Sequence, residues 1–225
     1  MSVLVLDTAS RFCSACVYDP AADTILAARE EAIGRGHAER LMGVVADVMD
    51  EAGAAFGDLT GLTVTIGPGS FTGIRVGVAA ARGIAVARSQ PVTGVTTLES
   101  LAVQAVDGEN PAGPFAVLIG GGRGQIFMQH FSADCDALDA ARAVPEDTVS
   151  ACLRPDCALL VGDAATAVGS DLPNAIDRPV GTIGAVARAG RLFAHAPSPL
   201  YLRGADAKPQ TGFALPRRSD GENAA

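Results

Sequence analysis

The stretch TIGPGSFTGIRVG, from Thr65 to Gly77, joins a short apolar run to the beginning of a predicted helix. Two glycines flank Pro68, and Ser70 or Thr72 can cap a helix that we expect to run to about Arg88. A strand, a glycine-rich loop and a helix in this order form the unit with which many α/β proteins bind phosphate. The first question is whether this loop binds a nucleotide.

Details of the loop argue against nucleotide binding. A P-loop needs a lysine after its glycines, and GPGSFTG has none. Gly67, Gly69 and Gly73 leave one residue too many for the dinucleotide-binding pattern, and Pro68 lacks the N–H that an anion would bind. The helix N-terminus can still attract an anion. The sequence favours a tight strand-to-helix turn, with Gly69 supplying a permissive backbone, over a nucleotide contact.

The helix after the loop has unusually small side chains. Each glycine costs a helix about 1 kcal/mol relative to alanine. Two interpretations stay open: close packing on the chain's own sheet, and close approach of a partner helix on the outer face. The small residues are Gly73, Gly77, Ala80, Ala81, Gly83, Ala85 and Ala87.

Upstream segments predict a mixed sheet. VLVLDTAS, CSACVYD and TILAARE are short strands separated by turn signals, so they form an antiparallel meander. HAERLMGVVADVMDEAG has helical spacing from His37 and a stop at Gly53. LTVTIG and PVTGV are further strands, and TTLESLAVQAV opens with the capping-box spacing of Thr96 and Glu99. The order β-β-β-α-β-α-β-α indicates a mixed sheet with helices on its faces.

A second, smaller α/β lobe follows. DGENPAGP is rich in Gly, Pro and Asp, which is typical of a linker. Beyond it, FAVLIG, GQIFMQHF and CALLVGDAA are expected strands, and TIGAVARAGRLFAHA is a late helix. We therefore expect an N-terminal lobe over residues 1–106, a C-terminal lobe over 107–205 and a disordered tail over 206–225.

Composition narrows the functional classes. The chain has 225 residues, a formal net charge of −8 and a pI of about 4.8, which argues against a broad basic surface for nucleic acid or anionic membrane. The N-terminus MSVLVLDTAS has no basic region and only a short apolar run, so it does not resemble a signal peptide. No segment has the roughly 20 apolar residues that span a bilayer. We expect a cytoplasmic protein that does not contact a membrane.

The sequence offers no self-sufficient catalytic or metal site. Three histidines occur, and none lies three or four residues from another, so a His-x-x-x-His metal site is absent. GPGSF is not the G-x-S-x-G elbow of a serine hydrolase. Cys13 and Cys16 lie three apart on an expected strand and point to opposite faces, so we expect reduced core thiols. Asp7 and Thr8 end the first strand, where they can position metal and phosphate or make local turn bonds.

Together these segments resemble the bacterial TsaB (YeaZ) family. The resemblance covers roughly residues 3–203 and rests on VLVLDTAS…CSACVYD, HAERLMGVVADVMDEAG, TIGPGSFTGIRVGVAAARGIA, VTGVTTLESLA, GGRGQIF, LLVGDAA and PLYLR. It implies the actin/Hsp70/sugar-kinase (ASKHA) type of α/β fold, with two RNase H-like lobes. In place of the family's usual Asp-Ala-Arg, this chain has Gly121, Gly122 and Arg123, which puts any role of that acidic residue in doubt.

The resemblance also implies a function. Members of the family are non-catalytic partners in making N6-threonylcarbamoyladenosine at position 37 of tRNA. The catalytic subunit TsaD carries a His-x-x-x-His that this chain lacks, and an ATPase, TsaE, joins the assembly. The family forms homodimers and exchanges one protomer for TsaD through the same helical surface. The chain is thus expected to have no cofactor of its own, with ATP and metal in its partners, and to meet tRNA only through the complex.

Site residues follow from the same resemblance. We expect a partner interface on the two N-lobe helices, formed by His37, Glu39, Leu41, Met42, Val45, Met49, Gly73, Gly77, Ala80, Ala81, Ile84 and Arg88. We expect a structural loop or vestigial phosphate site formed by Asp7, Thr8, Gly67, Pro68, Gly69, Ser70 and Thr72. Two rival functions remain. A stand-alone ATP-dependent kinase or ATPase would need phosphate motifs in both lobes, and a peptidase would need a nucleophile pair or a metal site.

Overall fold

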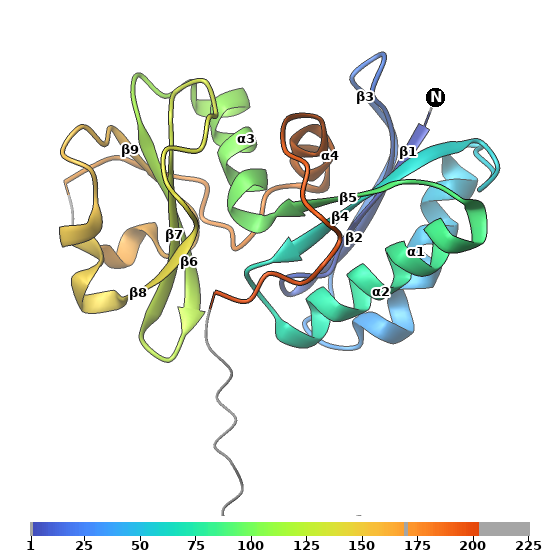
Figure 1. The fold of residues 1–225 in the computed structure, drawn as a ribbon, viewed down its shortest axis with the longest axis horizontal. Helices are drawn as coiled ribbons and strands as arrows, with labels where there is room; N and C mark the ends of the chain where they lie inside the picture. Colours follow the sequence, from blue (N-terminus) through green and yellow to red (C-terminus); the bar gives the residue numbers. More distant parts are fainter. Residues whose placement is uncertain (1, 169–170, 203–225) are drawn as a thin grey trace, which may run out of the picture.

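A computed structural model describes residues 2–168 and 171–202, which form two five-stranded sheets that face each other (Figure 1). The expected disordered tail, residues 206–225, lies outside the described residues, as does the end of the expected second lobe, residues 203–205. No helix among the described residues is both long and apolar enough to cross a bilayer.

The first sheet has the strand order β3-β2-β1-β4-β5. Strands β1 (Ser2–Asp7), β2 (Phe12–Asp19) and β3 (Thr24–Ala32) are antiparallel neighbours, which confirms the predicted meander. Strands β4 (Leu59–Gly67) and β5 (Val92–Thr96) add in parallel to β1. The sheet is mixed, as the element order predicted.

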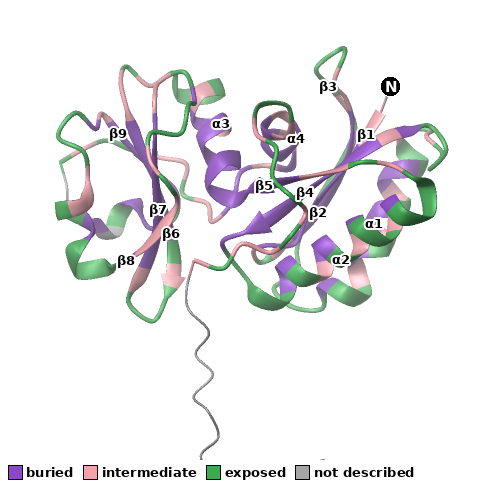
Figure 2. Cartoon of the chain, viewed as in Figure 1, coloured by how far each residue is buried: buried purple, intermediate pink, exposed green. Residues whose placement is uncertain are grey.

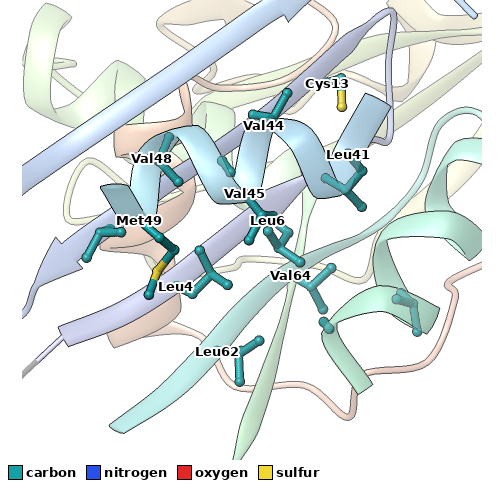
Figure 3. Packing of buried hydrophobic residues seen from close by; sticks show 14 of the residues in the cluster. Leu4, Leu6, Cys13, Leu41, Val44, Val45, Val48, Met49, Leu62 and Val64 are labelled. Carbon is teal, nitrogen blue, oxygen red and sulfur yellow. The ribbon is translucent and has the colours of Figure 1, made fainter. Parts of the chain in front are cut away.

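Two helices cover one face of this sheet. Both α1 (His37–Glu51) and α2 (Phe71–Arg88) connect parallel strands, so they run parallel to each other. Figure 3 shows Leu41, Val45 and Met49 of α1 pointing toward the strand residues Leu6 and Val64. Burial of this apolar layer fixes both helices on the sheet.

The other face of the first sheet receives α4 (Ile183–Leu192). Val186 packs against Val5, Cys16 and Tyr18, and Thr182 caps the helix by accepting from the N–H of Ala185. We expected this late helix in the second lobe. Its small, apolar inner face instead fits the surface that β1 and β2 leave uncovered, so the chain returns to the first lobe before it ends.

Between the sheets lies α3 (Thr97–Glu109), with the predicted capping box of Thr96 and Glu99. Its residues Leu98 and Leu101 pack in one cluster with Phe115 and Phe131 of the second sheet. The helix continues to Glu109, so the expected lobe boundary at residue 106 falls within it. The division into residues 1–106 and 107–205 remains a sequence-based prediction.

The second sheet has the order β10-β9-β6-β7-β8. Its strands are β6 (Phe115–Gly122), β7 (Gln125–Phe131), β8 (Arg142–Pro145), β9 (Leu159–Val161) and β10 (Asn174–Ala175). The 3-10 helices Glu146–Cys152 and Ala165–Val168 lie between them. The sequence did not predict β8 and β10, because strands of four and two residues are too short to show a period.

Residues 193–202, here called the strap, run from the end of α4 across the first sheet. The N–H of Gly94 donates to the carbonyl of His195 at 2.8 Å, and the N–H of His195 returns a bond of 3.0 Å. The N–H of Leu200 donates to the carbonyl of Ile66 at 2.8 Å. Leu200 packs on the core of the first sheet and Leu202 on that of α3 and the second sheet, so the strap connects both lobes.

Candidate functional site

The glycine-rich loop after β4 packs closely against the turn between β1 and β2. Ser70 caps α2 by accepting from the N–H of Gly73, and its own N–H donates to the carbonyl of Ala9 at 2.7 Å. A Cβ atom added at Gly69 would lie 2.2 Å from that carbonyl oxygen. Gly69 is therefore required by a close backbone approach, whereas the positive φ in this loop, 103°, is that of Gly67.

Close packing also explains the first two glycines of α2, Gly73 and Gly77. The hydroxyl of Thr8 donates to the carbonyl of Gly73 at 2.7 Å. A Cβ added at Gly77 would lie 2.5 Å from that hydroxyl oxygen. The turn between β1 and β2 thus packs directly against the loop and the start of α2. Of the other loop residues, Pro68 accepts a bond from Thr97 through its carbonyl and Thr72 is exposed.

Asp7 and Thr8 are buried where β1 ends. They are 2% and 1% exposed, and an Asp7 carboxylate oxygen accepts from the N–H of Ala9 at 3.0 Å and lies in hydrogen-bond contact with the Thr65 hydroxyl. Burial raises the pKa of the Asp7 carboxyl above its ordinary value, although the bonds from Thr65 and Ala9 oppose this shift. Both residues are therefore part of the core between β1, β4 and α2.

A cleft of about 540 Å³ lies between the two lobes. Its polar side chains are Ser10, Arg11 and Ser70 on the first lobe and Asp163 and Asp177 on the second. Asp163 accepts a bond of 2.9 Å from the N–H of Gly120. The backbone of Gly121 and Gly122 also lines it. This cleft holds one arginine and two carboxylates, and Asp7 and Thr8 do not line it.

Only some of the residues predicted for the partner interface are exposed at the surface. Figure 2 shows α1 and α2 buried on the side that faces the sheet and exposed on the other. Seven of the predicted residues are buried in the chain's own core, so they cannot present a surface: His37, Leu41, Val45, Met49, Gly73, Gly77 and Ala81. Glu39, Met42 and Arg88 are exposed, whereas Ala80 and Ile84 are half-buried. A role of these five in docking remains a prediction.

The burial of these seven residues follows from the period of the helix. Every third or fourth residue of α1 and α2 faces the sheet, and the sequence could not say which apolar side was the inner one. His37 begins the helix, as the sequence predicted, but it is buried, and its Nε2 lies 3.1 Å from the carbonyl oxygen of Phe12. Ala81 is fully buried, so a charge there would report on folding rather than on docking.

An exposed aromatic and arginine cluster lies at the first turn of α2. The Arg75 guanidinium lies over the Phe71 ring, 3.7 Å from its centroid, and its Nε donates to the Tyr201 hydroxyl at 2.8 Å. Phe71 is 55% exposed and Tyr201 44%. The sequence does not reveal this cluster, because Tyr201 is 126 residues from Arg75 and lies on the strap.

No cluster of three or more metal-ligating side chains occurs in residues 2–168 and 171–202. Cys13 packs in the core between the sheet and α1, and Cys16 packs on the opposite face against α4, which confirms that the two thiols point apart. All five cysteines are free.

These features define a class of protein: a two-lobed α/β chain of the ASKHA type, whose glycine-rich loop packs against the turn between β1 and β2. The sequence profile described as "TsaD: tRNA N6-adenosine threonylcarbamoyltransferase" matches residues 29–158. The solved structure of YeaZ from Pseudomonas aeruginosa matches with a TM-score of 0.75 and 23% identity, over 89% of this chain and 99% of that one, which shows the same fold.

Relatives agree with this assignment. The Escherichia coli tRNA threonylcarbamoyladenosine biosynthesis protein TsaB is 31% identical over 134 residues, which are 60% of this chain and 56% of that protein. A Caulobacter vibrioides tRNA N6-adenosine threonylcarbamoyltransferase is 39% identical over 97 residues, 43% of this chain and 26% of that enzyme. The chain thus matches about half of the first relative's length and a quarter of the second's. It belongs to the TsaB (YeaZ) family.

Proposed function

We propose that this chain is a non-catalytic subunit in the synthesis of N6-threonylcarbamoyladenosine in tRNA, and that it docks a TsaD-like catalytic subunit through the exposed face of α1 and α2. A TsaE-like ATPase completes the assembly, and tRNA is bound by the complex rather than by this chain. Relatives named for this biosynthesis and the net charge of −8 support this proposal.

Gly83 is the observation that carries it. This glycine is exposed in the middle of α2, and a Cβ added to it would meet nothing within 4 Å. Gly73 and Gly77 are explained by Thr8, but the chain's own packing does not require Gly83. A glycine in a helix costs about 1 kcal/mol relative to alanine, and close approach of a partner helix accounts for that cost. Exposed Met42 and Val86, at 49% and 83%, add apolar contact area on the two helices.

The burial of Asp7 and Thr8 supports a non-catalytic role. Because Asp7 and Thr8 are buried, they cannot hold a metal ion and a phosphate at the cleft in this conformation. We therefore propose that the chain needs no cofactor of its own, and that ATP and metal act in its partners. The alternative is an ATPase of the same fold, which the cleft between Arg11 and Asp163 favours. ATP hydrolysis by the isolated chain, lost on Asp163→Ala, would support that alternative.

The test is complex formation with the TsaD-like subunit of the same organism, measured by size-exclusion chromatography with light scattering. We expect a heterodimer for the wild type and none for Gly83→Glu, since the new side chain stands on the outer face of α2. Gly108→Glu is the matched control, because Gly108 is likewise exposed in a helix with open space around it, but on α3. A complex that survives Gly83→Glu, or a wild type that forms none, would refute docking through this face.

A further inference from the structure

The cleft between the two lobes carries charges that the chain leaves open. Arg11 lies on the wall formed by the first lobe, and Asp163 and Asp177 lie on the wall formed by the second. All three side chains are exposed, and the ion pairs found in residues 2–168 and 171–202 involve none of them. The wall of the second lobe therefore favours a cationic occupant.

Both carboxylates of this wall are held in place. A carboxylate oxygen of Asp163 accepts a bond of 2.9 Å from a backbone N–H of β6. Asp177 follows Ile176, whose φ of 60° is rare for a β-branched residue, and strain of this kind is concentrated at functional sites. The N–H of Arg178 donates to the Ile176 carbonyl at 2.9 Å, and its guanidinium lies 3.1 Å from Glu30 of β3. Carboxylates on such a fixed backbone lose little conformational entropy on binding.

The strap ends beside this cleft. The rings of Tyr201 and Phe71 have centroids 5.1 Å apart, and Ser70, the neighbour of Phe71, lines the cleft. Leu202 packs on the cluster formed by α3 and the second sheet, so the last described residue lies between the lobes (Figure 1). Residues 203–225 follow it. An extended chain covers about 3.3 Å per residue, so fifteen residues span up to about 50 Å, which is ample to reach the cleft.

The sequence beyond the strap supplies the charge that the second-lobe wall favours. Residues 208–218, KPQTGFALPRR, here called the basic segment, contain three cations and no carboxylate, in a chain whose net charge is −8. Phe213 and Leu215 add apolar side chains to this segment. The apolar side chains that line the cleft belong to Ile119, Phe127 and Pro179. Asp220 and Glu222 follow the basic segment, so the order of charges along the tail matches the opposite charges of the two walls.

We infer that the basic segment of this chain binds in its own interlobe cleft, with its cationic side chains against Asp163 and Asp177. Exposed ion pairs are individually weak, so a free cationic ligand would bind poorly to these two carboxylates. A segment tethered by a short linker has an effective concentration of about a millimolar, at which weak pairs suffice. A tail that cannot build its own core can still bind a preformed surface. The inference concerns the cleft and does not depend on docking through α1 and α2.

Carbodiimide cross-linking of the full chain tests this inference, because the reagent joins an ammonium group to a carboxylate that touches it and adds no spacer. Lys208 is the single lysine of the chain, so its products are readily assigned by peptide mass spectrometry. We expect links from Lys208 to Asp163 or Asp177 in the wild type. Arg217→Lys provides a second ammonium group in the basic segment and should add a link to the same two carboxylates. A mixture of isotope-labelled and unlabelled chains should give links within one chain only.

Arg217→Glu leaves Lys208 and both cleft carboxylates reactive, but it places a negative charge in the basic segment. We expect the yield of the Lys208 links to fall by about threefold or more. Arg203→Glu is the matched control, because it changes the net charge equally outside the segment, and it should leave the yield unchanged. The inference is overturned if neither the wild type nor Arg217→Lys forms a cleft link, if Lys208 links equally to exposed carboxylates elsewhere, if links join labelled to unlabelled chains, or if Arg217→Glu keeps the wild-type yield.

Discussion

A Cβ atom at Gly73 would lie 2.0 Å from the carbonyl oxygen of Thr8, so the start of α2 and the end of β1 touch backbone to backbone. The Thr8 hydroxyl completes this contact with its bond to the Gly73 carbonyl. The same glycines that suggested a phosphate loop are thus needed to seat a helix on a strand.

We predict that Gly73→Ala destabilises the chain, because a methyl group has no room beside the Thr8 carbonyl and the backbone must move. The expected loss is about 2–3 kcal/mol in the free energy of unfolding, measured by urea denaturation. Gly83→Ala provides the contrast, since its methyl group would meet nothing, and it should stabilise the chain by about 1 kcal/mol. Equal effects of the two substitutions would contradict the packing account of the loop.

Asp7 gives a pH-dependent prediction. Its pKa is raised by burial, so the folded state holds the proton more tightly than the unfolded state. The stability that this group contributes is complete below its unfolded pKa and is lost as the pH rises through its folded pKa. Asp7→Asn keeps an acceptor for Ala9 and Thr65 without the buried charge. We expect it to raise the melting temperature at pH 8 more than at pH 4.

Calorimetric melting of both chains from pH 4 to pH 8 checks this expectation. Thr8→Val is a useful companion, because it removes the bond to the Gly73 carbonyl without changing a charge. That variant should lower the melting temperature by a similar amount at every pH. If Asp7→Asn lost most stability at pH 8, the carboxylate would be stabilising there and the direction of its pKa shift would be the reverse.

Local patterns predicted the first lobe well, and the reason is visible in its elements. The meander, the capping box of Thr96 and Glu99 and the Ser70 cap depend on neighbours within a few residues, so the sequence contains their cause. The position of α4 depends on which sheet surface remains uncovered after the chain has folded elsewhere. That information is absent from any short segment.

The candidate site shows the same limit. Helical period identified α1 and α2 as amphipathic, but only the sheet decides that Val45 and Ala81 face inward while Met42 and Gly83 face outward.

The strap supplies a prediction about local stability. His195 Nε2 lies 2.7 Å from Glu99 Oε1, and the side chain of Glu99 is only 5% exposed. His195→Ala would leave that carboxylate oxygen without this partner in a buried position, a loss worth roughly 1–3 kcal/mol. We expect faster hydrogen exchange at the amides of Gly94 and Leu200, which bond to or from the strap.

Hydrogen exchange followed by mass spectrometry makes this measurement, with Ser198→Ala as the control. Ser198 lies on the same strap and is exposed, so its substitution should leave the exchange of both amides unchanged. Equal protection in His195→Ala and in the wild type would show that the backbone bonds alone hold the strap.

Thiol reactivity tests how well the packed cores of both lobes protect the buried cysteines. Burial raises the pKa of the Cys13 thiol to about 11 and that of Cys135 to about 12, and it also raises the pKa values of Cys16 and Cys157. Cys152 alone among the five is not buried. At pH 8 we expect one thiol of the native chain to react quickly with Ellman's reagent and four to react slowly, with all five reactive in guanidinium chloride. Cys152→Ser should abolish the fast phase. If a fast phase survived this substitution, one of the other four cysteines would lie in a segment that opens more readily than its packing indicates.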